Sequence, residues 1–96
     1  YKRLKDLTKN EKYFSVLNEP CQCKSNFWLQ TLILKKPSIQ NRNSILKKFH
    51  HNKILARPLW TPLHKLKYLR KFPKMNLKNT NIIEKKIINI PSSYYI

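Results

Sequence analysis

The longest nearly uncharged apolar stretch, residues 27–34 (FWLQTLIL), constrains the fold of this chain more than any other feature. It is rich in aromatic and branched side chains and is followed by a Lys-Lys-Pro sequence at residues 35–37, a pattern typical of a largely buried strand. It is too short to span a bilayer, and Lys24 lies just before it, which argues against a membrane role. We therefore expect a sheet with residues 27–34 as its central strand.

A helix and a second strand are predicted directly after this segment. Ser38 can cap a helix that continues to about His51. The apolar residues of the segment fall near one helical face: Ile39, Ile45, Leu46 and Phe49. The chain contains no glycine to end the helix, but asparagine tolerates left-handed backbone, so Asn52 is expected to end it. Residues 53–57 then read as a second strand, ended by Pro58.

The remaining segments complete a small layered fold. Residues 59–64 (LWTPLH) are too rich in proline for regular structure, so they are expected to form a shaped loop. Asn81 and Glu84 have the spacing of a capping box, which predicts a short helix from Asn81 to about Lys86. Residues 87–90 (IINI) form a third strand. This order predicts an α/β fold with a short, mainly antiparallel sheet covered by helices on one side.

The beginning of the chain is typical of the end of a helix. Tyr1, Leu4 and Leu7 recur every three residues among lysines, as on one face of an amphipathic helix. A short apolar cluster follows at residues 13–17, and Pro20 then breaks the pattern before a loop that carries two cysteines.

The domain organisation follows from these elements. The chain begins with Tyr1 rather than Met and has no signal-peptide pattern, so we expect it to be cut from a longer protein. At 96 residues it is long enough for one small domain. Residues 1–17 are interpreted as the end of a truncated helix with a linker cluster, and residues 18–96 as a small C-terminal domain.

The charge of the chain raises a second hypothesis. Its 21 Lys and Arg residues face only 4 acidic residues, giving a net charge of +17, and such an imbalance favours binding to polyanions. A small basic nucleic-acid-binding protein of ribosomal type is therefore the alternative function. Against it, most of the cations are scattered lysines, whereas base and phosphate recognition favours arginine. The many Asn and Ile residues and the single Ala also indicate an AT-rich coding sequence, which by itself enriches lysine.

Two cysteines and two adjacent histidines suggest a metal site only weakly. Cys21 and Cys23 are one residue apart, and His50 and His51 are neighbours, whereas zinc fingers space their ligands more widely. The cysteines cannot form the disulfide framework of a small secreted domain either, so a reducing compartment is expected. We predict no metal ligand in this chain.

Three sequence segments together are more specific than composition. They are residues 25–29 (SNFWL), residues 57–64 (RPLWTPLH) and residues 89–93 (NIPSS). In this order, and after the helix end at Tyr1, they resemble the C-terminal region of the DegT/DnrJ/StrS type of sugar aminotransferase, especially the branch that makes amino sugars for surface glycans. The family usually has a glycine at the turn before the second strand, where this chain has Asn52 and Lys53.

The resemblance implies a reaction, and it implies which part of the enzyme would bind the cofactor. It implies a fold-type I aminotransferase that moves an amino group from glutamate to a nucleotide-linked keto-deoxysugar through pyridoxal phosphate (PLP), in polysaccharide biosynthesis. The enzyme would be a cytoplasmic homodimer without membrane or nucleic-acid partners. The cofactor-binding domain, with the lysine that forms the Schiff base, would lie upstream of this chain. The fragment alone is therefore expected to be inactive and to hold no catalytic or cofactor-binding residue.

Three side chains are the candidate substrate-binding residues. Arg57 offers a planar guanidinium for a carboxylate or phosphate, although a surface or ion-paired arginine is the alternative. Trp60 can pack on a sugar or base, or anchor its loop on the core. His64 can contact the sugar or move a proton, or serve a structural role. Trp28, within the expected central strand, is predicted to belong to the core.

Overall fold

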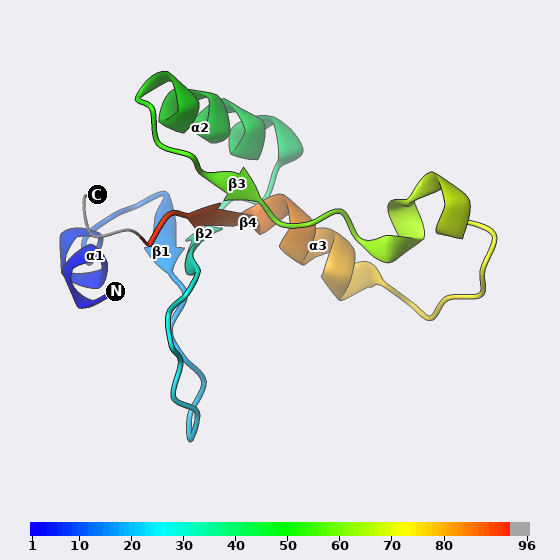
Figure 1. The fold of residues 1–96 in the computed structure, drawn as a ribbon, viewed down its shortest axis with the longest axis horizontal. Helices are drawn as coiled ribbons and strands as arrows, with labels where there is room; N and C mark the ends of the chain where they lie inside the picture. The colour runs from blue at the N-terminus through cyan, green and yellow to red at the C-terminus, as the bar shows by residue number, and fades with distance from the viewer. Residues whose placement is uncertain (93–96) are drawn as a thin grey trace.

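The computed structural model describes residues 1–92 of the chain and has the predicted class of fold, a small α/β domain with a four-stranded antiparallel sheet. Figure 1 shows the elements in chain order. They are α1 (Lys2–Leu7), β1 (Phe14–Val16), β2 (Gln30–Leu34), α2 (Ile39–His51), β3 (Arg57–Pro58), the 3-10 turns η1 (Leu63–Lys65) and η2 (Lys67–Leu69), α3 (Lys78–Lys86) and β4 (Ile87–Ile90).

The sheet has the order β1-β2-β4-β3, and each neighbouring pair is antiparallel. The predicted central strand is therefore an interior strand, and β4, predicted at its observed bounds, is the other. β1 lies within the apolar cluster at residues 13–17. β3 is an edge strand, which explains why Pro58 lies inside it: a proline lacks the N–H that an interior strand must donate.

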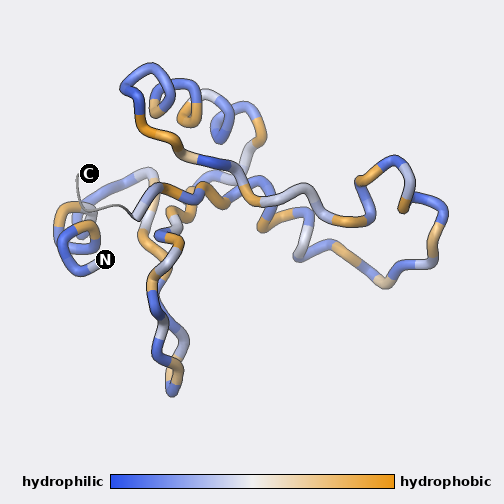
Figure 2. Tube along the Cα trace, viewed as in Figure 1, coloured by the Kyte–Doolittle hydropathy of each residue, from blue (hydrophilic) through white to orange (hydrophobic). Residues whose placement is uncertain are grey.

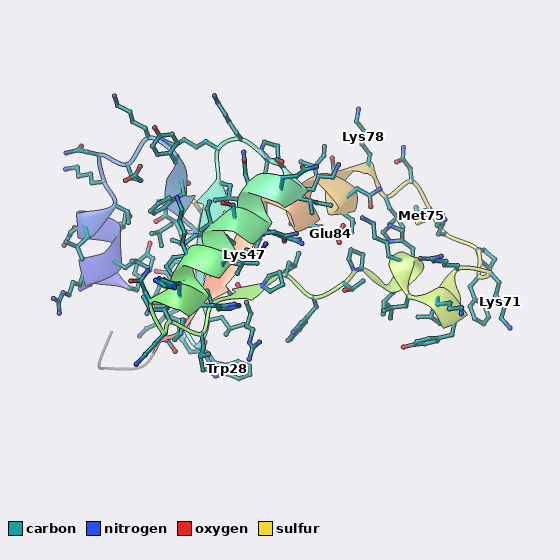
Figure 3. All side chains as sticks on the ribbon, turned by 90° about the horizontal axis from the view of Figure 1, so that it is seen from above. Trp28, Lys47, Lys71, Met75, Lys78 and Glu84 are labelled. Carbon is teal, nitrogen blue, oxygen red and sulfur yellow. The ribbon has the colours of Figure 1, made fainter. Side chains whose placement is uncertain are left out.

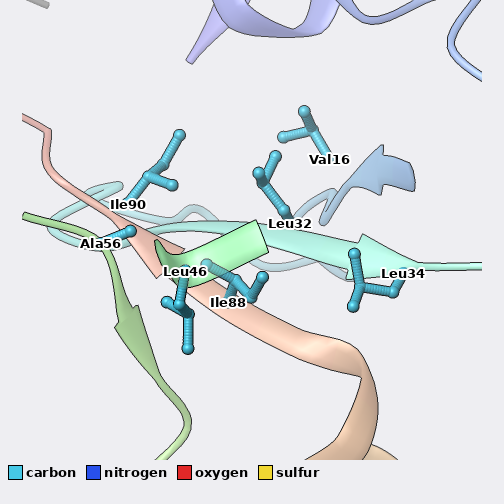
Figure 4. Packing of buried hydrophobic residues seen from close by; sticks show 7 residues of the cluster. All are labelled: Val16, Leu32, Leu34, Leu46, Ala56, Ile88 and Ile90. Carbon is cyan, nitrogen blue, oxygen red and sulfur yellow. The ribbon is translucent and has the colours of Figure 1, made fainter. Parts of the chain in front are cut away.

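One face of the sheet carries the core. Leu32 pairs with Val16 on one side and with Ile88 on the other, so these side chains point to the same face. Figure 4 shows the buried cluster, in which Ile88 and Ala56 are fully buried. Its members are Val16, Leu32, Leu34, Leu46, Ala56, Ile88 and Ile90. Side chains of the first residues and of α2 pack against it: Tyr1, Leu4, Ile45 and Phe49.

The helix α2 begins and ends where the sequence predicts, but the backbone conformation that ends it differs from the expected one. The side chain of Ser38 accepts a hydrogen bond from the backbone N–H of Asn41, as a capping residue does. Asn52 follows the last turn, but its φ is −85°, and the left-handed backbone falls on Lys53 with a φ of 60°. The expectation that Asn52 takes that conformation was wrong. The amide side chain of Asn52 instead donates to the carbonyl of Lys48 at 2.8 Å.

Three elements begin at residues other than those predicted. In each case a local hydrogen bond or a turn takes the place of the expected strand pairing or helix cap. The first strand begins at Gln30 rather than Phe27, since Phe27 has a φ of 50°. The second begins at Arg57 rather than residue 53, because residues 53–56 turn tightly, with the N–H of Ala56 donating to Ile54. The helix α3 begins at Lys78, whose N–H donates to the side chain of Asn76, so the capping box predicted at Asn81 was wrong.

Two segments project from this small core. One is the loop of residues 17–29 between β1 and β2, and the other is residues 59–77 between β3 and α3, here called the arm (Figure 1). Hydrophobic positions lie along the strands and again along the arm (Figure 2). The arm combines exposed apolar side chains with lysines, as the labelled Lys71 and Met75 show in Figure 3. The predicted loop at residues 59–64 is its first part, in which η1 begins at Leu63.

Candidate functional site

The sheet register brings the three motif segments to one end of the sheet. Gln30, which follows the first motif, pairs with Ile90 of the third. Arg57, which begins the second motif, pairs with Asn89 of the third. The hydroxyl of Ser92 also donates to the carbonyl of Trp28 at 2.7 Å and joins the first motif to the third directly. Ser93, the last residue of the third motif, lies outside the described residues.

A groove of about 840 Å³ opens at this end of the sheet. It receives side chains from all three motifs and from the turn between α2 and β3. Its lining residues are Trp28, Leu29, Asn52, Lys53, Ile54, Leu55, Arg57, Pro58, Trp60, Asn89, Ile90 and Pro91. Two of the three predicted substrate-binding residues, Arg57 and Trp60, therefore share one groove.

Arg57 lies on the edge strand β3 with its side chain exposed. It is in register with Asn89, which is in register with Thr31, so the three form a polar row on the face of the sheet opposite the core. The hydroxyl of Thr31 donates to the side-chain oxygen of Asn89 at 2.9 Å. Within residues 1–92 Arg57 forms no ion pair, which leaves its guanidinium available to an anionic ligand.

The backbone that presents Arg57 is fixed by α2. The N–H of Ile54 donates to the carbonyl of Phe49 at 2.9 Å, and the ring Nε2 of His50 lies 2.8 Å from the carbonyl oxygen of Ala56. Ala56 is itself fully buried. The residue before Arg57 is therefore held by both packing and a hydrogen bond, so Arg57 is carried on a rigid part of the fold.

Both tryptophans of the chain line the groove, and both are exposed. The exposed fraction is 82% for Trp60 and 72% for Trp28. Neither anchors the core, so the prediction of a core role for Trp28 was wrong. Figure 3 shows Trp28 directed away from the body of the domain. The cause is a turn in which the backbone N–H of Trp28 donates to the side chain of Asn26 at 3.1 Å, ahead of the first strand residue.

Trp28 and Lys53 are groove residues that the sequence did not indicate. The polar pair Ser25 and Asn26 was the available signal for Trp28, because such residues favour turns over strands. For Lys53 the signal was its position next to Asn52, where the family resemblance implies a glycine. Its positive φ places it in the turn that borders the groove.

The groove is cationic. Lys53 and Arg57 line it, and none of the chain's four acidic side chains, all of which lie in the described part, is among its lining residues. The broad apolar surfaces of the two tryptophans lie in the same groove. This combination suits a ligand that joins a planar or ring-shaped part to phosphate or carboxylate oxygens.

His64 lies outside the groove lining, in η1. Its Nε2 is 2.9 Å from the side-chain oxygen of Asn81 on α3, and its side chain is half-buried. The neighbouring Lys65 forms an ion pair with Glu84, one helical turn after Asn81. Glu84, labelled in Figure 3, is 8% exposed. The structure therefore brings Arg57 and Trp60 together and attaches His64 to α3.

The chain was compared with known proteins. The sequence pattern of the DegT/DnrJ/EryC1/StrS aminotransferase family matches residues 1–95, which is nearly the whole chain. The chain belongs to this family. Neither the curated proteins nor the solved structures gave a match. The family match agrees with the three motifs that converge at the groove, and it favours an aminotransferase origin over a nucleic-acid-binding protein.

Aminotransferases of this family generally use PLP, but the groove does not fit that cofactor by itself. A PLP phosphate is commonly held at a helix N-terminus, where backbone N–H groups point outward. The helix at this groove is α2, which reaches it with its C-terminal end, the end of partial negative charge, at Asn52. Nor does a carboxylate line the groove to face a pyridinium nitrogen. The groove lining alone therefore does not form a PLP site.

Among residues 1–92, no three side chains of His, Cys, Asp or Glu gather closely enough to bind a metal ion. Cys21 and Cys23 are exposed free thiols in the loop between β1 and β2. The helices of this part are all too short or too polar to cross a membrane.

Proposed function

We propose that this chain forms the substrate-side wall of a PLP-dependent aminotransferase that transfers an amino group from glutamate to a nucleotide-linked keto-deoxysugar. Arg57, Trp60 and His64 are the proposed substrate-binding residues. The observation that carries the proposal is the groove in which the three family motifs meet. Its combination of cations and tryptophans suits a nucleotide sugar better than it suits a purely apolar ligand.

Each groove residue has a part that follows from its chemistry. Arg57 would hold the pyrophosphate of the nucleotide sugar or the carboxylate of glutamate, because its guanidinium is exposed and free of an ion pair within residues 1–92. The ring of Trp60 would pack on the sugar or the base. Lys53 would add long-range attraction for the same anion. PLP supplies the electron sink of the reaction when it is bound, and its site is proposed to lie outside this chain.

The remaining assignments follow from the family. We propose that residues 18–96 form a small domain preceded by a helix end and linker at residues 1–17. The enzyme would be a cytoplasmic homodimer that serves polysaccharide biosynthesis. The chain alone should not transfer amino groups, because the groove lacks the groups that hold PLP.

Ligand binding can be measured through the two tryptophans, because the chain has no others and both line the groove. Titration of the 96-residue chain with uridine diphosphate, and separately with thymidine diphosphate, is expected to change tryptophan fluorescence saturably. Arg57→Gln should weaken this binding about tenfold or more, since a hydrogen bond to a charged group contributes about 1.5–3 kcal/mol.

The matched control is Arg70→Gln. Arg70 is an exposed arginine of the arm that does not line the groove, so its variant loses the same charge elsewhere. Equal weakening by Arg57→Gln and Arg70→Gln would show general attraction to a basic protein and contradict the proposed site. A fluorescence change that never saturates would contradict it as well. Trp60→Leu, with Trp28 retained as the reporter, tests the stacking contact separately.

A further inference from the structure

His64 and Lys65, which are adjacent in the arm, are both attached to α3. The ring of His64 meets Asn81, and the ammonium of Lys65 meets the carboxylate of Glu84. Asn81 and Glu84 are three residues apart on α3 and therefore lie on the same side of it. Arg42 of α2 completes the attachment, since its Nη1 donates to the backbone carbonyl of Glu84 at 2.8 Å. The position of His64 is thus fixed by three connected contacts.

The contact with Asn81 also determines where the proton of the imidazole resides. The Oδ1 of an amide can only accept a hydrogen bond, so Nε2 of His64 carries a proton and donates to Asn81. In the neutral ring Nδ1 then has the lone pair. Within residues 1–92 Nδ1 makes no hydrogen bond, and no side-chain nitrogen of that range is both buried and unpartnered. Nδ1 is therefore open to an incoming donor.

We propose that Asn81 is a positioning residue that holds His64 in the Nε2–H tautomer, so that Nδ1 accepts a hydrogen bond from a hydroxyl or ammonium group of the substrate. The part that concerns the substrate rests on the proposed function. The part that concerns the tautomer does not, because it follows from the hydrogen bond between two residues of this chain.

The chain contains its own standards for the measurement. His50 contacts the backbone carbonyl of Ala56, which has no donor form, so His50 must be an Nε2–H tautomer. His51 is exposed and has no hydrogen-bond partner within residues 1–92, so it should show an average of both tautomers. His64 is expected to resemble His50 and not His51.

The experiment is long-range proton–nitrogen correlation NMR of the chain labelled with 15N in histidine, in alkaline solution where imidazole is neutral. Single His→Gln variants assign the three rings. In the unmodified chain His64 should show a protonated Nε2 and an unprotonated Nδ1, as His50 does. In Asn81→Leu the His64 signals should move to the averaged values of His51, while those of His50 stay in place.

Asn79→Leu is the control, because Asn79 lies exposed on the same helix and its side chain makes no hydrogen bond with His64. An averaged or Nδ1–H His64 in the unmodified chain overturns the inference even if Asn81→Leu does not fold. The inference is also overturned if the His64 spectrum is the same in Asn81→Leu as in the unmodified chain while the His50 signals show an intact fold.

Activity measurements on the complete aminotransferase separate this inference from the proposed function. Asn81→Leu should raise KM for the nucleotide sugar about three- to tenfold, the effect of losing or misdirecting one neutral hydrogen bond, and Asn79→Leu should not. A locked tautomer together with unchanged kcat and KM in both Asn81→Leu and His64→Gln would remove His64 from the proposed substrate site. The control of the tautomer by Asn81 would then stand alone.

Discussion

Lys53 is the residue at which the absence of glycine has its clearest structural effect. Its φ of 60° is in the left-handed region, where a side chain beyond glycine crowds the backbone. The backbone N–H of Lys53 donates to the carbonyl of His50 at 2.9 Å, which closes the end of α2. The family resemblance implies a glycine at this turn, and this chain has a groove-lining lysine there. The chain thus accepts backbone strain at a position that adds a cation to the groove.

Lys53→Gly should therefore stabilise the chain. Relief of the left-handed strain is expected to raise the free energy of unfolding by about 0.5–1 kcal/mol, after allowance for the greater freedom of glycine in the unfolded chain. Urea denaturation followed by circular dichroism measures the change. Lys47→Gly, at an exposed position inside α2, should lower the same quantity by about 1 kcal/mol. If both variants shift stability in the same direction, Lys53 is not strained.

Single residues also mark the limit of what the sequence predicts. Arg57 and Trp60 were chosen from one short motif and do share a groove, but Trp28 was assigned to the core and is exposed there. An aromatic residue at the start of an apolar run suits a strand and a turn equally well. Whether Trp28 lies in a turn or in a strand depends on its hydrogen bond to Asn26 and on its contact with Ser92, a residue far along the chain. His64 lies outside the groove because its ring contacts Asn81 on α3. That contact joins residues far apart in the sequence, so it could not be predicted from a local pattern.

At the scale of elements, the sequence predicted the helices α1, α2 and α3 and the strands β2, β3 and β4, whereas β1 lies in a segment for which only an apolar cluster was predicted. Local polar contacts decided where the elements begin. α2 and β4 have the strongest patterns and were located within one residue. The strand expected at residues 53–57 was reduced to two residues because the tight turn after α2 uses the preceding four. Strand register was not predictable at all, since the pairing of β2 with β4 joins segments separated by a helix, the arm and another helix.

The interior strand β4 should therefore be sensitive to loss of volume. Ile88 is fully buried and lies opposite Leu32, so Ile88→Ala is expected to lower the free energy of unfolding by about 2–5 kcal/mol. Denaturant titration measures it. Ile83→Ala is the matched control, because Ile83 lies on α3 with 44% of its surface exposed, and its effect should stay within about 0.5 kcal/mol. Similar losses in the two variants would contradict the position of the core.

Over the whole molecule, the distribution of charge dominates. Between Glu19 and Glu84 there is no acidic residue, so most of the chain is cationic and its lysines repel one another. The radius of gyration of 14.9 Å exceeds the roughly 12–13 Å expected for a compact chain of this length, because the loop and the arm extend from the core. The single ion pair seen within residues 1–92 joins Lys65 of the arm to Glu84 of α3.

Salt should accordingly stabilise the chain. An increase of NaCl from about 20 mM to about 0.5 M shortens the screening length several-fold and is expected to raise the melting temperature by about 5 °C. Differential scanning calorimetry measures this change. The double variant Lys71→Gln and Lys74→Gln, which removes two exposed charges from the arm, should show a smaller rise. A melting temperature that falls or stays constant with salt would mean that repulsion between lysines does not limit stability.

The order of strands also determines when the domain can form. β2 has β1 beside it early, but its other edge is filled by β4, the last of the described elements to be synthesised. Until β4 leaves the ribosome, Leu32 lacks its partner Ile88, and one edge of the nascent sheet has unpaired N–H and carbonyl groups. The final step is the closure of a long chain segment, which is slow compared with hairpin formation. Folding of this domain is thus a late event, and the interval before it is when the nascent chain most needs protection from aggregation.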